Sequence, residues 1–128
     1  MTNPSDHLVG RLRLAAHDYG GSGQDVLLMH GGGRTHQDWD EFARILIREG
    51  GFRPVAMDLR GHGASGPGPW SWDAAVADAA AVIAVLGLRT PVVVGHSLGG
   101  MVAAVWATVH DDCPLAVTCL RHVRDSLG

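Results

Sequence analysis

The sequence has two cysteines, few aromatic residues, no cluster of basic residues and no long apolar run. Cys113 and Cys119 have no histidine or cysteine partners at zinc-binding spacing, so in a reducing compartment we expect free thiols. The formal net charge of -3, with no basic stretch interleaved with aromatic residues, argues against a nucleic-acid partner. The apolar runs are too short to span a bilayer, which argues against a membrane protein.

The beginning of the chain also lacks the pattern of a secretory signal. Residues 1–7 are polar and no apolar segment follows them, so we expect a cytoplasmic protein. Hydrophobic residues make up 46% of the chain and charged residues 18%, which argues against disorder. The 128 residues suffice for one compact domain with a core.

Short apolar runs bounded by glycine and proline alternate with stretches that have helical apolar spacing. The runs predict strands at 11–16 (an edge strand), 26–29, 54–57, 92–94 and 115–120. Helices are expected to begin at Thr35 and Ser71 and to end at Gly50 and Gly87. A third helix, over residues 101–106, is apolar on nearly every side and is expected to be buried. This alternation predicts an α/β fold with a mainly parallel sheet and helices on both faces.

The sharpest chemical signal lies between the strand at 92–94 and the third helix, where the chain reads Gly95-His96-Ser97-Leu98-Gly99. A serine in such a G-x-S-x-G turn is held on a strained bend, and its hydroxyl projects at the carboxyl end of the sheet. The Leu98 amide would start the helix, where an unpaired donor can hold a developing oxyanion. The alternative is a glycine-rich turn that merely packs a helix on a strand.

A second signal, His30-Gly31-Gly32-Gly33, directly follows the strand at 26–29. Glycines let backbone amides approach a ligand closely, and Gly32 is the best candidate for a second oxyanion donor opposite Leu98. For His30 we expect a hydrogen-bonded structural role.

With these motifs, the chain resembles the α/β-hydrolase fold family in its serine esterase and lipase-like branch. The resemblance covers about residues 8–110 and includes a third landmark at residues 58–65, similar to the D-x-R-G-x-G-x-S loop that usually braces the site. Because Ser97 occupies the nucleophile position, the chain looks unlike the epoxide hydrolases and haloalkane dehalogenases of that family. The resemblance implies a small-molecule acyl substrate and neither a metal nor an organic cofactor.

The family pattern implies an acid and then a histidine after the nucleophile. Residues 98–128 leave room for a helix and one strand, so residues 1–128 are expected to form a single partial domain that lacks the C-terminal strands and cap. The tail at 111–128 departs from the pattern, and one hypothesis is a premature stop or a frameshift near Thr118. An exposed sheet edge would then favour a homodimer.

Among the histidines, His62 and His122 are the candidate bases, each with a competing assignment. His62 fits a bracing loop residue, and His122 fits a solvated tail although Asp125 follows it at helical spacing. For His7, His17, His36 and His110 the sequence suggests no surrounding constellation. Two hypotheses remain open: a serine hydrolase acting on a small ester, and a catalytically inactive remnant or dimerising interaction module.

Overall fold

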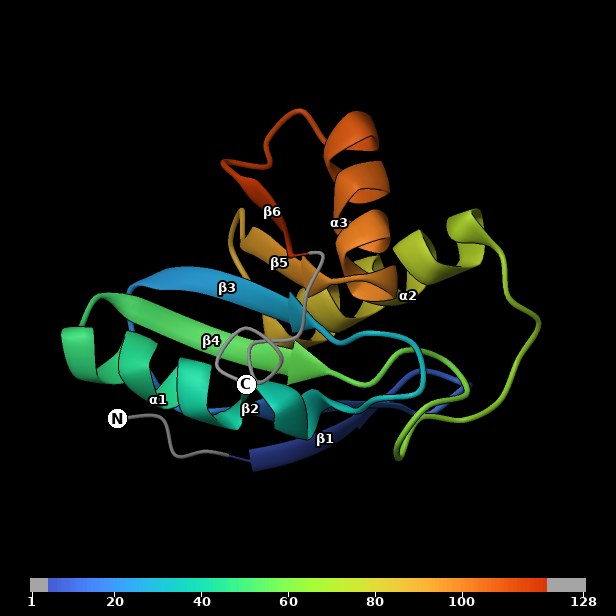
Figure 1. Cartoon of the computed structure of the whole chain (residues 1–128), viewed down its shortest axis with the longest axis horizontal. Coiled ribbons are helices and arrows are strands. Elements are labelled where there is room, and N and C mark those ends of the chain that lie inside the picture. Colours follow the sequence, from blue (N-terminus) through green and yellow to red (C-terminus); the bar gives the residue numbers. More distant parts are fainter. Residues whose placement is uncertain (1–4, 120–128) are drawn as a thin grey trace.

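The computed structural model describes residues 5–119, and their centre is a six-stranded sheet with the order β1-β2-β4-β3-β5-β6 (Figure 1). The strands are β1 (Ser5–Val9), β2 (Leu14–Asp18), β3 (Gln24–Met29), β4 (Phe52–Met57), β5 (Val92–His96) and β6 (Ala116–Cys119). The four strands from β4 to β6 in this order run parallel, whereas β1 and β2 pair antiparallel at one edge. The predicted mainly parallel sheet is therefore confirmed.

Helices cover both faces of the sheet, because the buried strands are apolar on both sides (Figure 1). Along β3, Leu27 and Met29 belong to the core under α2 (Trp72–Leu86) and α3 (Leu98–Val109). Val26 and Leu28 belong to the opposite core, which includes Trp39 of the 3-10 helix η1 (His36–Trp39) and Ala43 of α1 (Asp40–Glu49). The expected arrangement of helices on both faces is also confirmed.

The helices start and stop where the expected capping residues stand. Ser71 accepts a hydrogen bond from the Ala74 amide at 3.0 Å, and α2 ends at Gly87 with φ of 65°. Thr35 caps as predicted, accepting from the Gln37 amide at 3.3 Å. It caps the 3-10 turn of η1, however, and the α-helix itself begins at Asp40.

The N-terminal edge differs from the predicted single strand at 11–16. Residues 10–13 form a tight turn between β1 and β2, closed by a hydrogen bond from the Arg13 amide to the Gly10 carbonyl at 3.1 Å. Gly10 has a φ of 74° and Arg13 a φ of 53°, so the chain reverses where a strand was expected. The second strand extends to Asp18, which pairs with Ser5 and Val55 in the sheet and whose buried carboxylate contacts Arg53 at 2.9 Å.

The third helix is buried on one side, which corrects the expectation of burial all round. Val102, Ala103 and Trp106 face the core, but Met101 is 53% exposed and Val109 is 61% exposed. An apolar composition alone cannot tell a helix between two layers from one whose outer face lies open. No helix among residues 5–119 is both long and apolar enough to cross a membrane.

Candidate functional site

Ser97 occupies the turn between β5 and α3 in a backbone conformation that residues other than glycine rarely adopt. Its φ is 51° and its ψ is -111°, and the residue is exposed. Such a conformation costs on the order of 1 to 3 kcal/mol and persists only where the surroundings enforce it. Here the Ser97 amide donates to the Cys119 carbonyl at 2.7 Å, and the Ser97 carbonyl accepts from the Met101 amide at 3.0 Å.

Three glycines allow this turn to pack tightly. A Cβ atom on Gly95 would lie 2.1 Å from the Gly99 carbonyl oxygen, and one on Gly99 would lie 2.2 Å from the Met29 carbonyl oxygen. A Cβ on Gly100 would lie 2.5 Å from the Thr118 side chain. Both β3 and β6 therefore approach the turn as closely as bare backbone permits.

The loop after β3 lies against the serine turn. The Gly99 amide donates to the His30 carbonyl at 3.1 Å, and a Cβ on Gly32 would lie 3.7 Å from the Leu98 side chain. A hydrogen bond from the Arg34 amide to the Gly31 carbonyl at 3.1 Å closes a turn with Gly32 and Gly33 at its centre. Gly32 and Leu98 are thus neighbours, as the sequence analysis expected.

His30 has the structural role predicted for it. The side chain is completely buried, and its Nε2 accepts from the Leu59 amide at 2.9 Å. Its Nδ1 therefore carries the proton and donates to the Gly31 carbonyl at 2.7 Å. Burial lowers the pKa of His30 below its ordinary value, which keeps the ring neutral.

The loop after β4 is organised around the buried carboxylate of Asp58. Its Oδ1 accepts from the His36 amide at 2.7 Å and from His36 Nδ1 at 3.0 Å, and its Oδ2 accepts from the Ala64 amide at 3.0 Å. Burial by itself would raise the pKa of Asp58, but the hydrogen bonds from His36 and Ala64 outweigh it and lower the pKa to about 2. A Cβ on Gly63 would collide with this carboxylate at 2.4 Å.

Two further contacts fix the same loop. Ser65 donates to the Asp58 carbonyl at 2.6 Å and accepts from the Ala15 amide at 2.8 Å. Arg60 makes a paired contact with the buried Asp78 of α2, at 2.7 Å and 2.8 Å. These contacts fix the loop at residues 58–65 against β2 and α2. The resemblance implied such a bracing role for this loop.

Of the two candidate bases, His62 lies within the described residues. His62 Nδ1 contacts the Arg60 carbonyl at 3.0 Å, and its ring packs on that of His30 with centroids 5.1 Å apart. The ring hydrogen bonds of His17, His30, His36, His62 and His110 go to groups other than Ser97. His122 lies outside the described residues. Among the described residues, the arrangement thus brings the exposed Ser97, Leu98 and the backbone of Gly32 together.

His17 and His36, for which no constellation was expected, each lie beside a carboxylate. His36 is paired with Asp58, and His17 Nδ1 lies 2.5 Å from Asp6 Oδ1 on the neighbouring strand. The sequence analysis missed both because each pair joins separate elements. A sequence prediction of an antiparallel β1–β2 hairpin could have placed Asp6 opposite His17, because the two residues pair in its register.

Comparison with known proteins agrees with this geometry. A family model for the alpha/beta hydrolase family matches residues 26–125. The chain is 44% identical to a non-heme haloperoxidase of Rhodococcus erythropolis over 93 residues, covering 70% of this chain and 33% of that protein. It is 36% identical to a bifunctional esterase/perhydrolase of Acinetobacter calcoaceticus over 100 residues, covering 74% and 35% of the two chains.

Solved structures show the same relation. An epoxide hydrolase from an endophytic Streptomyces superposes with a TM-score of 0.69 at 34% sequence identity, covering 88% of this chain and 34% of that one. The chain spans about one third of the length of these relatives. With the parallel sheet, the strained serine turn and the braced loop in place, the matches show that the chain belongs to the alpha/beta hydrolase family.

Proposed function

We propose that this chain carries the nucleophile and the oxyanion donors of a serine hydrolase acting on a small ester or a related acyl substrate. Ser97 Oγ attacks the carbonyl carbon, and the amides of Gly32 and Leu98 stabilise the oxyanion. Collapse of that intermediate expels the alcohol, which takes up the proton lost by Ser97, and water then releases the acid from the acyl-enzyme.

The observation that carries the proposal is the conformation of Ser97 together with the position of Gly32. Ser97 has a φ of 51°, is exposed, and its side chain makes no capping hydrogen bond to α3, as a nucleophile at this turn requires. The backbone of Gly32 lies beside Leu98, the first residue of α3, whose amide lacks a partner within the helix. The closeness of Gly32 to Leu98, next to Ser97 in the chain, supports the proposed pairing of two donors with one nucleophile.

The proposal needs a base and an acid. In a complete triad the histidine contacts the serine, whereas the His62 ring contacts the Arg60 carbonyl and the His30 ring. We infer that the base and the acid come from a segment outside these 128 residues or from another chain, with His62 and His122 as the candidate bases within them. A serine without its triad partners retains only a residual rate, about 10³ to 10⁴ above that in water.

The test compares the hydrolysis of p-nitrophenyl acetate and butyrate by the purified chain and by Ser97→Ala. We expect slow turnover that disappears in Ser97→Ala and persists in Ser22→Ala, which removes an exposed hydroxyl from another turn. A fluorophosphonate probe followed by mass spectrometry should label Ser97 alone. Equal background hydrolysis in all three proteins, with no labelling, would contradict the proposal.

A second candidate function is that of a dimerising interaction module without catalysis. The observation in its favour is the exposure of apolar side chains on α3 and just before β6: Met101 is 53%, Val109 61% and Leu115 55% exposed. Light scattering of the purified chain distinguishes the two. A dimer that Val109→Asp converts to a monomer, together with absent turnover, favours the module.

A further inference from the structure

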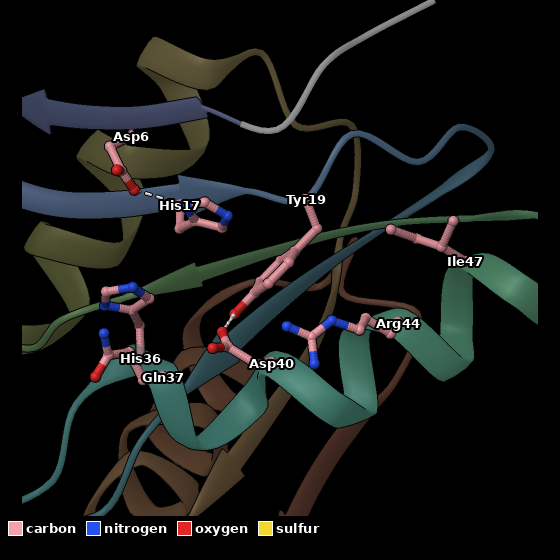
Figure 2. A pocket seen from close by; sticks show the side chains of 8 residues that line it. All are labelled: Asp6, His17, Tyr19, His36, Gln37, Asp40, Arg44 and Ile47. Carbon is pink, nitrogen blue, oxygen red and sulfur yellow. Dashed lines mark hydrogen bonds and ion pairs between the residues drawn. The ribbon is translucent and has the colours of Figure 1, made fainter.

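A pocket of about 430 Å³ lies between the β1–β2 hairpin and the start of α1, on the face of the sheet that α1 covers (Figure 2). Its lining includes Asp6, His17 and His36, with Gln37, Asp40 and Arg44 around them. None of these residues belongs to the serine turn or to the loop after β3. The pocket is therefore separate from the machinery proposed for ester hydrolysis.

We propose that Asp6, His17 and His36 form a binding site for a divalent transition-metal ion, with zinc as the representative metal. One potential ligand atom from each residue lies within 4.8 Å of the other two. A tetrahedral zinc ion with bonds of about 2.0 to 2.2 Å holds its ligands about 3.3 Å apart. Small side-chain rotations are thus enough to bring the three groups onto one ion.

The fold places each ligand by a different means. Asp6 and His17 are paired residues on neighbouring antiparallel strands, so their side chains emerge on the same face. His36 is the first residue of η1, and its ring lies across the pocket from His17 with centroids 5.8 Å apart (Figure 2). Three elements therefore converge on one point.

His36 has the orientation that a metal-binding imidazole commonly has. Its Nδ1 contacts the buried Asp58 carboxylate at 3.0 Å, which leaves Nε2 as the ligating atom. Metal-binding histidines usually donate their second ring N–H to a carboxylate or a carbonyl, which fixes the ring and its tautomer. Asp58, itself held by the Ala64 amide, supplies that outer contact here.

Asp6 and His17 already share the position that an ion would take. Their Oδ1 and Nδ1 atoms are 2.5 Å apart, so an ion replaces the shared proton and widens the contact by about 1 Å, given metal–ligand bonds of about 2 Å. The Asp6 side chain is 84% exposed and can move to make room. Binding therefore releases a proton and weakens as the pH falls.

The charges around the pocket favour a cation, and the donor set indicates which kind. The carboxylates of Asp40 and Asp58 act on His36 together with that of Asp6, and Arg44 offsets part of this negative charge. Two imidazoles and one carboxylate suit zinc, nickel, cobalt or copper, whereas magnesium and calcium prefer oxygen ligands alone. Water or the Gln37 amide oxygen would complete the coordination.

The deciding experiment is calorimetric titration of untagged protein with zinc chloride at pH 7.5. We expect one ion per chain, and at least a tenfold loss of affinity in each of Asp6→Asn, His17→Gln and His36→Gln. His110→Gln is the matched control, because His110 stacks on Trp106 in α3 and has no place in the pocket. Its affinity should equal that of the parent chain.

A second measurement keeps the test independent of folding defects. Cobalt titration should produce visible absorption bands in the parent chain and in His110→Gln, and these bands should be absent in Asp6→Asn, whose exposed side chain is not needed for packing. Absence of saturable binding in the parent chain, or equal binding in Asp6→Asn and His110→Gln, would overturn the proposal. Neither result depends on ester hydrolysis.

Discussion

Two loops at the carboxyl edge of the sheet are built in opposite ways. The loop after β4, residues 58–66, is held by side chains: Asp58, Ser65 and Arg60 each make at least two polar contacts. The turn after β5, residues 95–100, is held almost entirely by backbone. The glycines at 95 and 99 allow close backbone packing, and the amides of Ser97 and Gly99 donate hydrogen bonds. One loop buries its polar groups, and the other leaves a hydroxyl exposed.

The difference shows how a fold can position a reactive side chain without engaging that side chain in hydrogen bonds of its own. A side chain engaged in bracing has no remaining hydrogen-bonding capacity for a substrate. Because main-chain contacts set the position of Ser97, its hydroxyl remains available to a ligand. The loop after β4 can use its carboxylate fully, because Asp58 is not required to react.

The largest expected effect comes from adding one methyl group to the serine turn. Gly95→Ala places a Cβ about 2 Å from backbone atoms of Gly99 and Gly100, none of which can move independently. We expect an insoluble or unfolded protein, a loss above about 4 kcal/mol. Circular dichroism and thermal melts provide the measurement. Gly32→Ala, whose Cβ meets only an ordinary contact at 3.7 Å, should melt like the parent chain.

The next largest expected loss of stability comes from a substitution in the loop after β4. Asp58→Ala leaves the His36 and Ala64 amides without their acceptor and removes a buried, fully bonded carboxylate. The expected loss of unfolding free energy is about 3 to 5 kcal/mol, measured by urea denaturation. Asp112→Ala, at an exposed position, is the control and should change little. A loss below 1 kcal/mol for Asp58→Ala would show that the side chains do not brace this loop.

A smaller effect of opposite sign tests the strain at Ser97. Ser97→Gly removes the hydroxyl and accepts a φ of 51° without cost, so we expect a gain of about 1 kcal/mol in unfolding free energy. Ser97→Ala keeps the Cβ and should show no such gain. A thermal melt that ranks the glycine variant no higher than the alanine variant would mean that the turn is relaxed.

The smallest effect is a change in pH dependence at His30, which joins the two loops. Its pKa is lowered by burial, so below about pH 6.5 the unfolded chain takes up a proton that the folded chain does not. This contribution to stability is present above that pH and is lost as the pH falls toward the lowered folded pKa. His36 acts in the other direction, because its pKa is raised by Asp58 and its contribution is lost as the pH rises through that value.

The measurement compares melting temperatures at pH 7.5 and 5.5 in the parent chain and in His30→Gln. Because His36 is unchanged between the two proteins, their difference isolates His30. We expect the parent chain to lose more stability on acidification than the variant does. Equal losses would mean that His30 is protonated in the folded protein.

The sequence predicted those parts of the fold that local chemistry controls. Ser71 and Gly87 bound α2 as expected, and the motif around Ser97 lies between a strand and a helix. Residues 11–13 were misassigned because a left-handed Arg13 has no sequence signature. The open face of α3 could not be predicted either, since burial depends on what covers a helix.

The candidate site was predictable where a motif is contiguous and unpredictable where it is assembled. Ser97, Gly32 and Leu98 were found from two short motifs, and their roles as nucleophile and oxyanion donors stay predictions. The pairs His36–Asp58 and His17–Asp6 join residues from separate elements and were missed. The frameshift hypothesis concerns the chain beyond Thr118, and Thr118 itself lies within β6 and donates to the Gly100 carbonyl at 2.9 Å.

The hydrogen bond from the Ser97 amide to the Cys119 carbonyl ties the serine to an edge strand. In residues 5–119, β6 pairs with a neighbour on one side alone, and such strands open more readily than central ones. Each opening would release the Ser97 amide to solvent, so its deuterium exchange rate would follow the fraying of β6. The lifetime of the serine turn thus depends on the strand beside it as well as on the packing of its own glycines.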